Sequence, residues 1–360
     1  MDSSDDFSIE TNDLSTLFTK VEKIGLGTYG KVYKCLDVRK KQTVALKKIK
    51  ILKPNDGFPV NTVREIKCLK ELKHDNIIRL RNVITLYKPN KPSTVWLSFD
   101  YCEFDLFGLL HKTDFPQLST NQVLSYARQL ILAMLQCKQA EILHRDLKPA
   151  NLFITRDNVL KIGDFGLARK YKSDDIKYTY NVITLYYRAP ELILGCQNYQ
   201  YEVDVWSVGC ILYELCTNKY LFKAPIGKEI DQLTAIFKIT GTPDLEEWPE
   251  FKELDKGGLF TQKIEGNLLE YLEKTIPPEF EGAADLISKM CRLTPSKRIT
   301  MQEAFMHPFI SRNGQPIEAS QLPPISLMEM HQMQASAELN KNKKDKSVHD
   351  SPPRPEKPEI

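Results

Sequence analysis

The most informative stretch of the sequence is ILHRDLKPAN, residues 142–151, which places an acid, two bases, a histidine and an amide between apolar flanks. Two short apolar runs follow, LFI and VLKI, with a polar turn between them, and the second run ends in GDFG. This pattern predicts a β-hairpin, and we expect Asp146, Asn151 and Asp164 to converge because a hairpin folds back on itself. Carboxylate and amide oxygens suit Mg²⁺, which binds one or two protein carboxylates together with substrate phosphates. The sequence therefore predicts a metal-assisted centre here, and the competing interpretation is a polar loop and a tight turn without chemistry.

Composition restricts the class of protein. The chain has 360 residues, 42% hydrophobic and 27% charged, which is ordinary for a globular protein with a substantial core. A net charge of +3 is too small to argue for direct nucleic-acid binding or an acidic membrane surface. The eight cysteines include no Cys-x-x-Cys pair, which argues against a zinc site or a disulfide framework. The acidic N-terminus is unlike a signal peptide and no apolar run could span a bilayer, so we expect a soluble intracellular protein.

A glycine-rich segment precedes these residues by more than a hundred positions. Gly25, Gly27 and Gly30 form G-x-G-x-x-G, a pattern shared by dinucleotide-binding turns and by ordinary glycine hairpins. A dinucleotide-binding turn requires a helix to follow directly, whereas residues 31–38 alternate like a second strand. Strand, glycine loop and strand form the lid that lays backbone N–H groups over ATP phosphates, so a dehydrogenase is disfavoured.

A lysine and a glutamate provide the next candidate pair. Lys47 lies on a predicted strand over 43–49, where it would meet the α- and β-phosphates. Glu65 lies on a predicted helix that begins at Asn61 or Thr62, and we expect it to pair with Lys47. A solvent-facing charge is the alternative interpretation of Glu65.

The remaining elements divide the chain into regions. We expect a flexible acidic extension over 1–17 and a disordered tail over 310–360, which contains proline and lysine and no aromatic residue. The lysine-rich patch at 341–346 is interpreted as a solvated charge run, with a nuclear import signal as the alternative. Between these ends we expect mainly strands up to about residue 101 and mainly helices afterwards. Further strands are predicted near 83–86 and 95–101, and helices near 121–139, 203–215, 229–239 and 283–293.

Taken in chain order, these motifs resemble the eukaryotic protein kinases over residues 18–309. The resemblance implies an α+β bilobal fold, with a small, mainly β N-lobe (18–101) that carries one regulatory helix and a larger, mainly α C-lobe (102–309). It implies that Asp146 is the catalytic base, that Lys148 stabilises the transferring phosphoryl group, and that Asn151 and Asp164 hold Mg²⁺. The catalytic set implied by the resemblance is Asp146, Lys148, Lys47, Glu65 and Thr184.

The resemblance also implies an ATP site. Its adenine pocket would be formed by apolar side chains from both lobes, and the backbone of Asp100 and Cys102 would bond to the adenine edge. The implied ATP-binding residues are Ile24, Gly25, Leu26, Gly27, Thr28, Tyr29, Gly30, Lys31, Val32, Ala45, Lys47, Phe99, Asp100, Cys102, Asp105 and Leu152. Two further residues are expected to serve the fold: Arg298 as the buried partner of Glu191, and Asp204 as the support of the catalytic loop.

Several features narrow the resemblance to the cyclin-dependent serine/threonine kinases. Lys148, three residues before Asn151, is typical of serine/threonine kinases, and PVNTVREI at 59–66 is similar to the cyclin-binding helix. A cyclin subunit is therefore the expected partner. Thr179 occupies the position of the activating phosphothreonine, which an upstream kinase would modify. Its phosphate would need guanidinium partners, and Arg64, Arg145 and Arg169 occupy the matching positions.

The same resemblance implies a type of substrate and a branch of the cyclin-dependent kinases. Val182, Ile183 and Arg188 match a pocket for the proline of Ser-Pro and Thr-Pro substrates. Thr28 and Tyr29 match inhibitory phosphorylation sites. The alternative is that they are ordinary loop residues that are not phosphorylated. The segments GFP at 57–59 and FDYCE at 99–103 resemble the transcription-linked branch, which acts in the nucleus on substrates of the RNA polymerase II C-terminal domain type. Ala189 leaves the cell-cycle branch open, with the cytoplasm as a second location, and a non-catalytic scaffold that binds cyclin and ATP is a further alternative.

Overall fold

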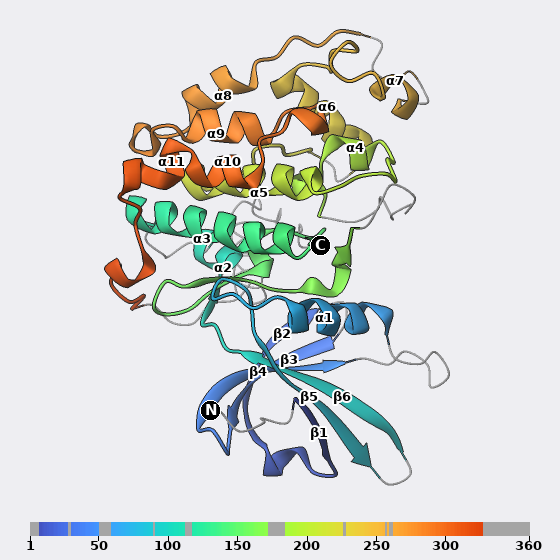
Figure 1. Cartoon of the computed structure of the whole chain (residues 1–360), viewed down its shortest axis with the longest axis vertical. Helices are drawn as coiled ribbons and strands as arrows, with labels where there is room; N and C mark the ends of the chain where they lie inside the picture. Colours follow the sequence, from blue (N-terminus) through green and yellow to red (C-terminus); the bar gives the residue numbers. More distant parts are fainter. Residues whose placement is uncertain are drawn as a thin grey trace, which may run out of the picture.

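The chain forms a β-sheet lobe followed by a larger helical lobe (Figure 1). This computed structural model describes residues 7–27, 30–49, 59–88, 91–111, 117–171, 184–225, 228–255, 258 and 262–326. The predicted α+β bilobal fold is confirmed, with one helix in the mainly β N-lobe and a mainly α C-lobe. No helix in the described part of the chain is long and apolar enough to cross a membrane.

A six-stranded sheet forms the N-lobe, with strand order β1-β5-β6-β4-β3-β2. All neighbouring strands are antiparallel except β1 and β5, which are parallel. Val44 and Leu46 on β4 are buried in a core on one face of the sheet. Because side chains alternate along a strand, Ala45 and Lys47 point to the opposite face. The strand bounds are β1 Ser8–Thr11, β2 Phe18–Gly27, β3 Gly30–Asp37, β4 Gln42–Ile49, β5 Leu80–Lys88 and β6 Lys91–Asp100.

The α-helix found among the described residues of the N-lobe, α1 (Val60–Glu71), buries Thr62, Glu65, Cys68 and Leu69. These positions recur at helical spacing, so one stripe of the helix faces the protein and Glu65 lies within that stripe. The predicted start at Asn61 or Thr62 is within two residues of the observed one.

The C-lobe is built around α5 (Glu202–Thr217), which is buried along nearly its whole length. α3 (Thr120–Gln139) begins at a capping box in which Ser119 and Gln122 satisfy each other's backbone N–H groups. Short strands and further helices surround these two. They are β7 Phe104–Asp105, α2 Leu106–His111, β8 Ile142–Leu143, β9 Leu152–Ile154, β10 Leu160–Ile162, β11 Arg169–Lys170, α4 Pro190–Ile193, α6 Glu229–Thr240, α7 Phe251–Leu254, α8 Leu268–Thr275, α9 Ala283–Met290, α10 Met301–Met306 and α11 Pro308–Ser311.

The expectation of a flexible extension over 1–17 is wrong for residues 7–17. β1 pairs in register with β5, from Ser8 opposite Val83 to Thr11 opposite Leu86. A short 3₁₀ turn, Leu14–Thr16, is capped by the Asp13 side chain, and the carbonyl of Leu17 accepts a 2.9 Å hydrogen bond from Val38 N. The otherwise open edge of β5 explains this order, because it offers unpaired backbone groups to a passing strand.

The expectation of a disordered tail from residue 310 is likewise wrong as far as residue 326. Ile325 is buried, and its N–H donates to the carbonyl of Arg156 at 2.8 Å. Arg156 Nη1 donates back to Ile325 O at 2.7 Å, and Asn158 Nδ2 donates to Pro323 O at 2.8 Å. Hydrogen bonds to backbone carbonyls, which any sequence supplies, therefore fix this segment on the C-lobe. The lysine-rich patch at 341–346 lies outside the described residues.

Candidate active site

Lys47 and Glu65 form a buried ion pair between β4 and α1. Lys47 Nζ lies 2.8 Å from both carboxylate oxygens of Glu65, whose side chain is 3% exposed. Burial alone would lower the pKa of Lys47, but the charges of Glu65 and Asp164 outweigh it and raise that pKa above its ordinary value. Lys47 is therefore held as a positive charge. The predicted pairing of Lys47 with Glu65 is formed, and the solvent-facing interpretation of Glu65 is wrong.

The predicted hairpin is formed by β9 and β10, with Leu152 opposite Ile162. Asn151 precedes β9, and its carbonyl accepts a 2.9 Å hydrogen bond from Gly163 N at the end of β10. Asn151 Nδ2 donates to Asp146 O at 2.7 Å and to Asp146 Oδ2 at 3.0 Å. Lys148 Nζ lies 2.8 Å from the same Oδ2. The hairpin thus brings Asp146, Lys148 and Asn151 together and places Asp164 beside them.

Asp164 carries the feature that fits a cation. Its Oδ1 is buried, has no hydrogen bond among the described residues and lies 3.6 Å from Lys47 Nζ. Burial raises the pKa of Asp164, but the charges of Lys47, His144 and Lys148 outweigh it and lower that pKa below its usual value. An ionised carboxylate with one oxygen left without a hydrogen bond suits a hard divalent ion. The described residues contain no group of three or more His, Cys, Asp or Glu side chains that could hold a metal ion. The predicted Mg²⁺ ligands are Asn151 and Asp164, which would share the ion with phosphate oxygens.

Asp204 supports the catalytic loop by accepting hydrogen bonds from the backbone of that loop. Its carboxylate is fully buried at the start of α5 and accepts the backbone N–H groups of His144 (2.7 Å) and Arg145 (3.0 Å). Burial raises the pKa of Asp204, while His144 and the two N–H groups act against this rise. His144 Nε2 donates in turn to Gly163 O at 2.9 Å, so the loop is fastened to both α5 and the end of β10. The structural role predicted for Asp204 agrees with these contacts.

Glu191 and Arg298 also make the predicted buried contact. Arg298 Nη1 and Nη2 lie 2.6 and 2.7 Å from the two oxygens of Glu191, in a bidentate pair. The side chains are 0% and 3% exposed. This pair fixes α4, which directly follows the segment that ends at Ala189, against the base of the C-lobe.

The described residues predicted to hold the nucleotide lie on the sheet, on the connection between the lobes and on β9. Ile24, Phe99 and Leu152 are buried, and Ala45 is paired with Phe99 across β4 and β6. Gly27 lies opposite Gly30 at the end of β2 and β3, and a Cβ on Gly30 would lie 1.8 Å from the carbonyl oxygen of Lys48. Only glycine fits that position.

The other predicted nucleotide residues differ in their surroundings. Asp100 pairs with Arg81 Nε at 2.7 Å, and burial raises the pKa of the Cys102 thiol to about 12, which keeps it uncharged. Asp105 is buried, and its Oδ1 accepts the N–H of Gly108 at 2.7 Å, so it caps α2 and its contact with nucleotide stays a prediction. Gly25 lies opposite Val32, and Lys31 is exposed. Thr28, Tyr29 and the side chain of Leu26 lie outside the described residues.

A comparison with protein families decides the assignment. The family described as protein kinase domain matches residues 18–310. The chain belongs to the protein kinase family.

Two relatives show which kinases this chain is similar to. It is 37% identical over 319 residues to Cyclin-dependent kinase 12 from Caenorhabditis elegans, a match that covers 87% of this chain and 42% of that protein. The kinase thus spans less than half the length of this curated relative. It is also similar to the crystal structure of the yeast RNA Pol II CTD kinase CTDK-1 complex, with a TM-score of 0.74 and 34% identity over 86% of this chain and 96% of that chain. The expected resemblance to cyclin-dependent kinases of the transcription-linked branch is confirmed.

The predicted phosphate-sensing arginines of the kinase lie on three elements. Arg145 is buried and donates to Leu167 O at 2.8 and 2.6 Å and to the Tyr199 hydroxyl at 3.0 Å. Arg169 lies on β11, and its buried Nε has no hydrogen bond among the described residues. Arg64 on α1 donates to Asn61 Oδ1 at 3.1 Å. Thr179, which they are predicted to bind when phosphorylated, lies outside the described residues.

The predicted substrate pocket is described only in part. Arg188 is buried and pairs with Glu229 at 2.6 Å, which ties the end of the activation segment to α6. Thr184 is exposed, and its carbonyl accepts the N–H of Tyr187 at 2.9 Å. Val182 and Ile183 lie outside the described residues.

A buried network beside this pocket is absent from the sequence-based predictions. Glu214 on α5 is fully buried, and its two oxygens lie 2.8 Å from His111 Nε2 and 2.7 Å from the Tyr187 hydroxyl. Burial and the Glu214 charge raise the pKa of Tyr187, so its hydroxyl stays protonated and donates. The signal in the sequence was Glu214, the one charged residue within the mostly apolar run at 205–216.

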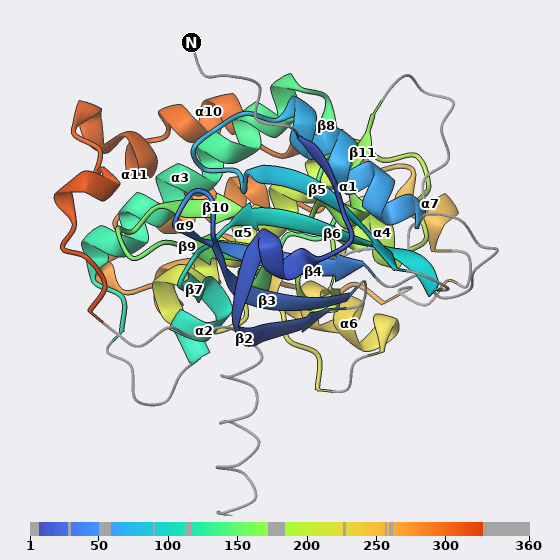
Figure 2. The same ribbon diagram turned by 90° about the horizontal axis from the view of Figure 1, so that it is seen from below.

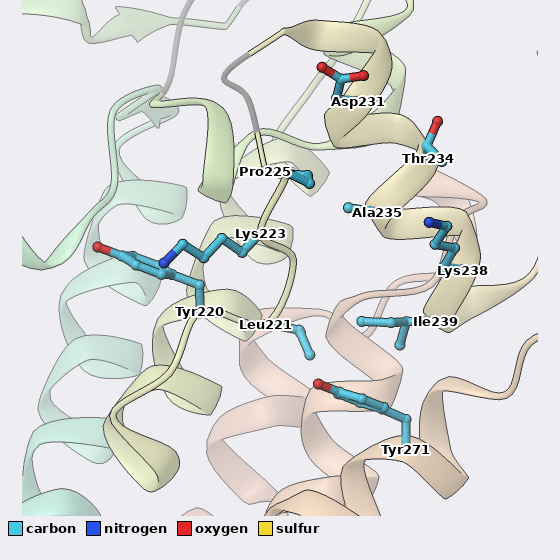
Figure 3. Close-up of a pocket in the computed structure, with 10 residues that line it drawn as sticks. All are labelled: Tyr220, Leu221, Lys223, Pro225, Asp231, Thr234, Ala235, Lys238, Ile239 and Tyr271. Atoms are coloured by element: carbon cyan, nitrogen blue, oxygen red, sulfur yellow. The ribbon is translucent and has the colours of Figure 1, made fainter.

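A cavity of about 470 Å³ lies elsewhere in the C-lobe, between the segment after α5, α6 and α8. Figure 3 shows Tyr220 on one side, Ala235 and Ile239 on the helix at the other side, and Tyr271 below them. None of the described residues that line it belongs to the predicted catalytic or nucleotide set, so this cavity is separate from the candidate active site.

Proposed function

We propose that this protein is a cyclin-dependent serine/threonine kinase that transfers the γ-phosphate of ATP to Ser-Pro and Thr-Pro sites. The observation that carries the proposal is the joint presence of the Lys47–Glu65 pair and the Asp146–Lys148–Asn151 group beside the Asp164 carboxylate. A non-catalytic scaffold would have no need for this complete set.

The geometry supports a direct transfer. Asp146 accepts the proton of the substrate hydroxyl as its oxygen attacks the γ-phosphorus, and the bond to the β-phosphate oxygen breaks to release ADP. Lys148, 2.8 Å from Asp146 Oδ2, supplies positive charge where the phosphoryl group passes. Lys47, held by Glu65, binds the α- and β-phosphates. Mg²⁺ held by Asn151 and Asp164 would neutralise charge on the phosphate oxygens when bound.

We further propose two levels of regulation. A cyclin would bind α1 and thereby govern the Lys47–Glu65 pair. Phosphate on Thr179, added by an upstream kinase, would join Arg64, Arg145 and Arg169 through charge-assisted hydrogen bonds. Arg169 Nε, buried without a hydrogen bond among the described residues, supports such a role. Thr28 and Tyr29 are proposed only as candidate inhibitory sites.

A role in transcription is the proposed setting. The similarity to Cyclin-dependent kinase 12 and to the yeast CTD kinase complex supports the C-terminal domain of RNA polymerase II as the type of substrate. Such a substrate implies a nuclear location.

Paired peptides test the proposed activity. The full chain, purified with its co-expressed cyclin, is supplied with MgATP and with a Ser-Pro peptide or its Ser-Ala counterpart. We expect kcat/KM to be at least about tenfold higher for the Ser-Pro peptide, since a fitted apolar pocket discriminates by about this factor per missing group. Equal turnover of the two peptides would reject proline specificity, and absence of transfer to either would reject the catalytic proposal.

The Lys47–Glu65 ion pair provides a second test of the proposed activity. Glu65→Gln removes the charge that faces Lys47 and leaves the side-chain shape in place. Charge-assisted hydrogen bonds contribute about 1.5–3 kcal/mol, so we expect kcat/KM for ATP to fall by about 10- to 100-fold. Glu71→Gln is the matched control, because Glu71 lies on the same helix in an exposed pair with Lys170. A Glu65→Gln enzyme as active as Glu71→Gln would contradict the role of the pair.

A further inference from the structure

The N-terminal segment adds a strand to the sheet next to the helix that carries Glu65. β1 runs along the open edge of β5, close to α1 (Figure 2). Immediately before β1, the carbonyl of Phe7 accepts a 2.8 Å hydrogen bond from Val83 N, which continues the pairing. On the exposed side, the Tyr87 hydroxyl donates to Glu10 at 3.2 Å. The position of Phe7 is thus set by backbone bonds on β5 and not by α1.

Phe7 in turn contacts α1. Lys70 Nζ lies 4.1 Å from the centre of the Phe7 ring, in a cation–π arrangement. The ring is half-buried and packs against the core cluster to which Cys68, Leu69 and Leu72 belong. The last turn of α1 therefore meets an aromatic ring fixed to the sheet.

This contact matters because the described N-terminal end of α1 has little local support. Pro59 precedes the helix, and no side chain caps its first turn. At the other end, Lys70 rests on Phe7 and Glu71 pairs with Lys170 at 2.6 Å in an exposed ion pair. An exposed ion pair contributes little on its own, whereas an aromatic ring at the core boundary adds apolar burial.

We propose that Phe7 is a positioning residue: carried by β1, it braces the last turn of α1 so that Glu65 stays paired with Lys47. The brace is part of the same chain and would act with or without a bound partner. Its effect on turnover rests on the proposed kinase function, whereas its effect on the helix does not.

The test compares two substitutions on one strand. Phe7→Ala removes the ring under Lys70, whereas the matched control Ile9→Ala removes an apolar side chain that packs against the separate cluster of Phe18, Cys35, Val44, Leu46 and Ile84. Hydrogen–deuterium exchange of the full chain is followed by mass spectrometry over residues 60–71. We expect Phe7→Ala to speed exchange in α1 about fivefold and Ile9→Ala to leave it unchanged. With the cyclin-bound enzyme, we expect Phe7→Ala to raise KM for ATP about threefold with a smaller effect on kcat.

A milder change keeps the proposal testable if Phe7→Ala folds poorly. Lys70→Met removes the cation from the exposed end of the side chain and should speed exchange in α1 about twofold. Equal α1 exchange in Phe7→Ala and Ile9→Ala, or no change in Lys70→Met, would overturn the brace. Because exchange requires no turnover, that outcome would leave the proposed kinase function standing.

Discussion

Asp146→Asn is expected to abolish phosphate transfer while the fold survives. Two donors, Lys148 Nζ at 2.8 Å and Asn151 Nδ2 at 3.0 Å, point at Asp146 Oδ2. An asparagine can present its own oxygen to both, so the loop keeps its contacts. It cannot accept a proton from the substrate hydroxyl, and loss of a positioned base costs about 10²- to 10⁴-fold in rate.

Transfer is measured as kcat on a Ser-Pro peptide with cyclin and MgATP present. Survival of the fold is measured by thermal unfolding and by co-purification with cyclin. Asp157→Asn is the matched control, since Asp157 is exposed at the turn of the β9–β10 hairpin, which follows the catalytic loop. We expect the control to retain full activity and both variants to unfold at the wild-type temperature. An active Asp146→Asn enzyme would disprove the assigned base, and a drop in its melting temperature would mean that Asp146 also supports the fold.

Arg298→Leu is expected to give the largest loss of stability. The substitution leaves the Glu191 carboxylate buried without its bidentate partner. Arg298 also donates to the carbonyls of Arg292 and Glu202, both at 2.9 Å, and these bonds are lost as well. Removing one member of a buried pair costs about 3–5 kcal/mol in the free energy of unfolding. In a domain of this size we expect the melting temperature to fall by about 10 °C.

The double variant Glu191→Leu/Arg298→Leu separates the charge effect from lost packing. It removes both buried charges, so we expect it to recover part of the free energy of unfolding that Arg298→Leu loses. Arg292→Leu, at a nearby exposed position, should unfold like the wild type. Unfolding of Arg298→Leu within about 1 kcal/mol of the wild type would show that the pair contributes little to stability.

Local patterns predicted a mainly strand region followed by a mainly helical one, and the hairpin at the centre of the site, whereas the bilobal fold was implied by the resemblance to protein kinases. The β9–β10 hairpin follows from two apolar runs and a turn, and α3 follows from the spacing of its apolar residues. The Lys47–Glu65 pair was predicted because a strand lysine in this place needs a carboxylate from the next helix, and the distance of 2.8 Å agrees. Each of these features is encoded within a few neighbouring residues or by one charge that requires another.

The features that the sequence did not predict depend on distant or generic partners. Residues 7–17 form a short segment with few apolar side chains, and β1 pairs there because β5 offers an open edge, which no local pattern reports. The segment at 317–326 is fixed mainly through backbone carbonyls and two apolar side chains, Ile317 and Ile325, that pack on the core. The cap that Asp105 provides for α2 was also not predicted, because the sequence does not show which backbone N–H its carboxylate accepts; its contact with nucleotide stays a prediction.

The parallel pairing of β1 also bears on how the chain is made. Ser8 pairs with Val83, so β1 leaves the ribosome before its partner strand, which is synthesised 75 residues later. Strands β2, β3 and β4 adjoin one another in sequence and can associate as they emerge, whereas β1 closes the sheet only after β5 is in place. At this edge of the N-lobe, a strand that is synthesised before the rest of the sheet is the last to join it.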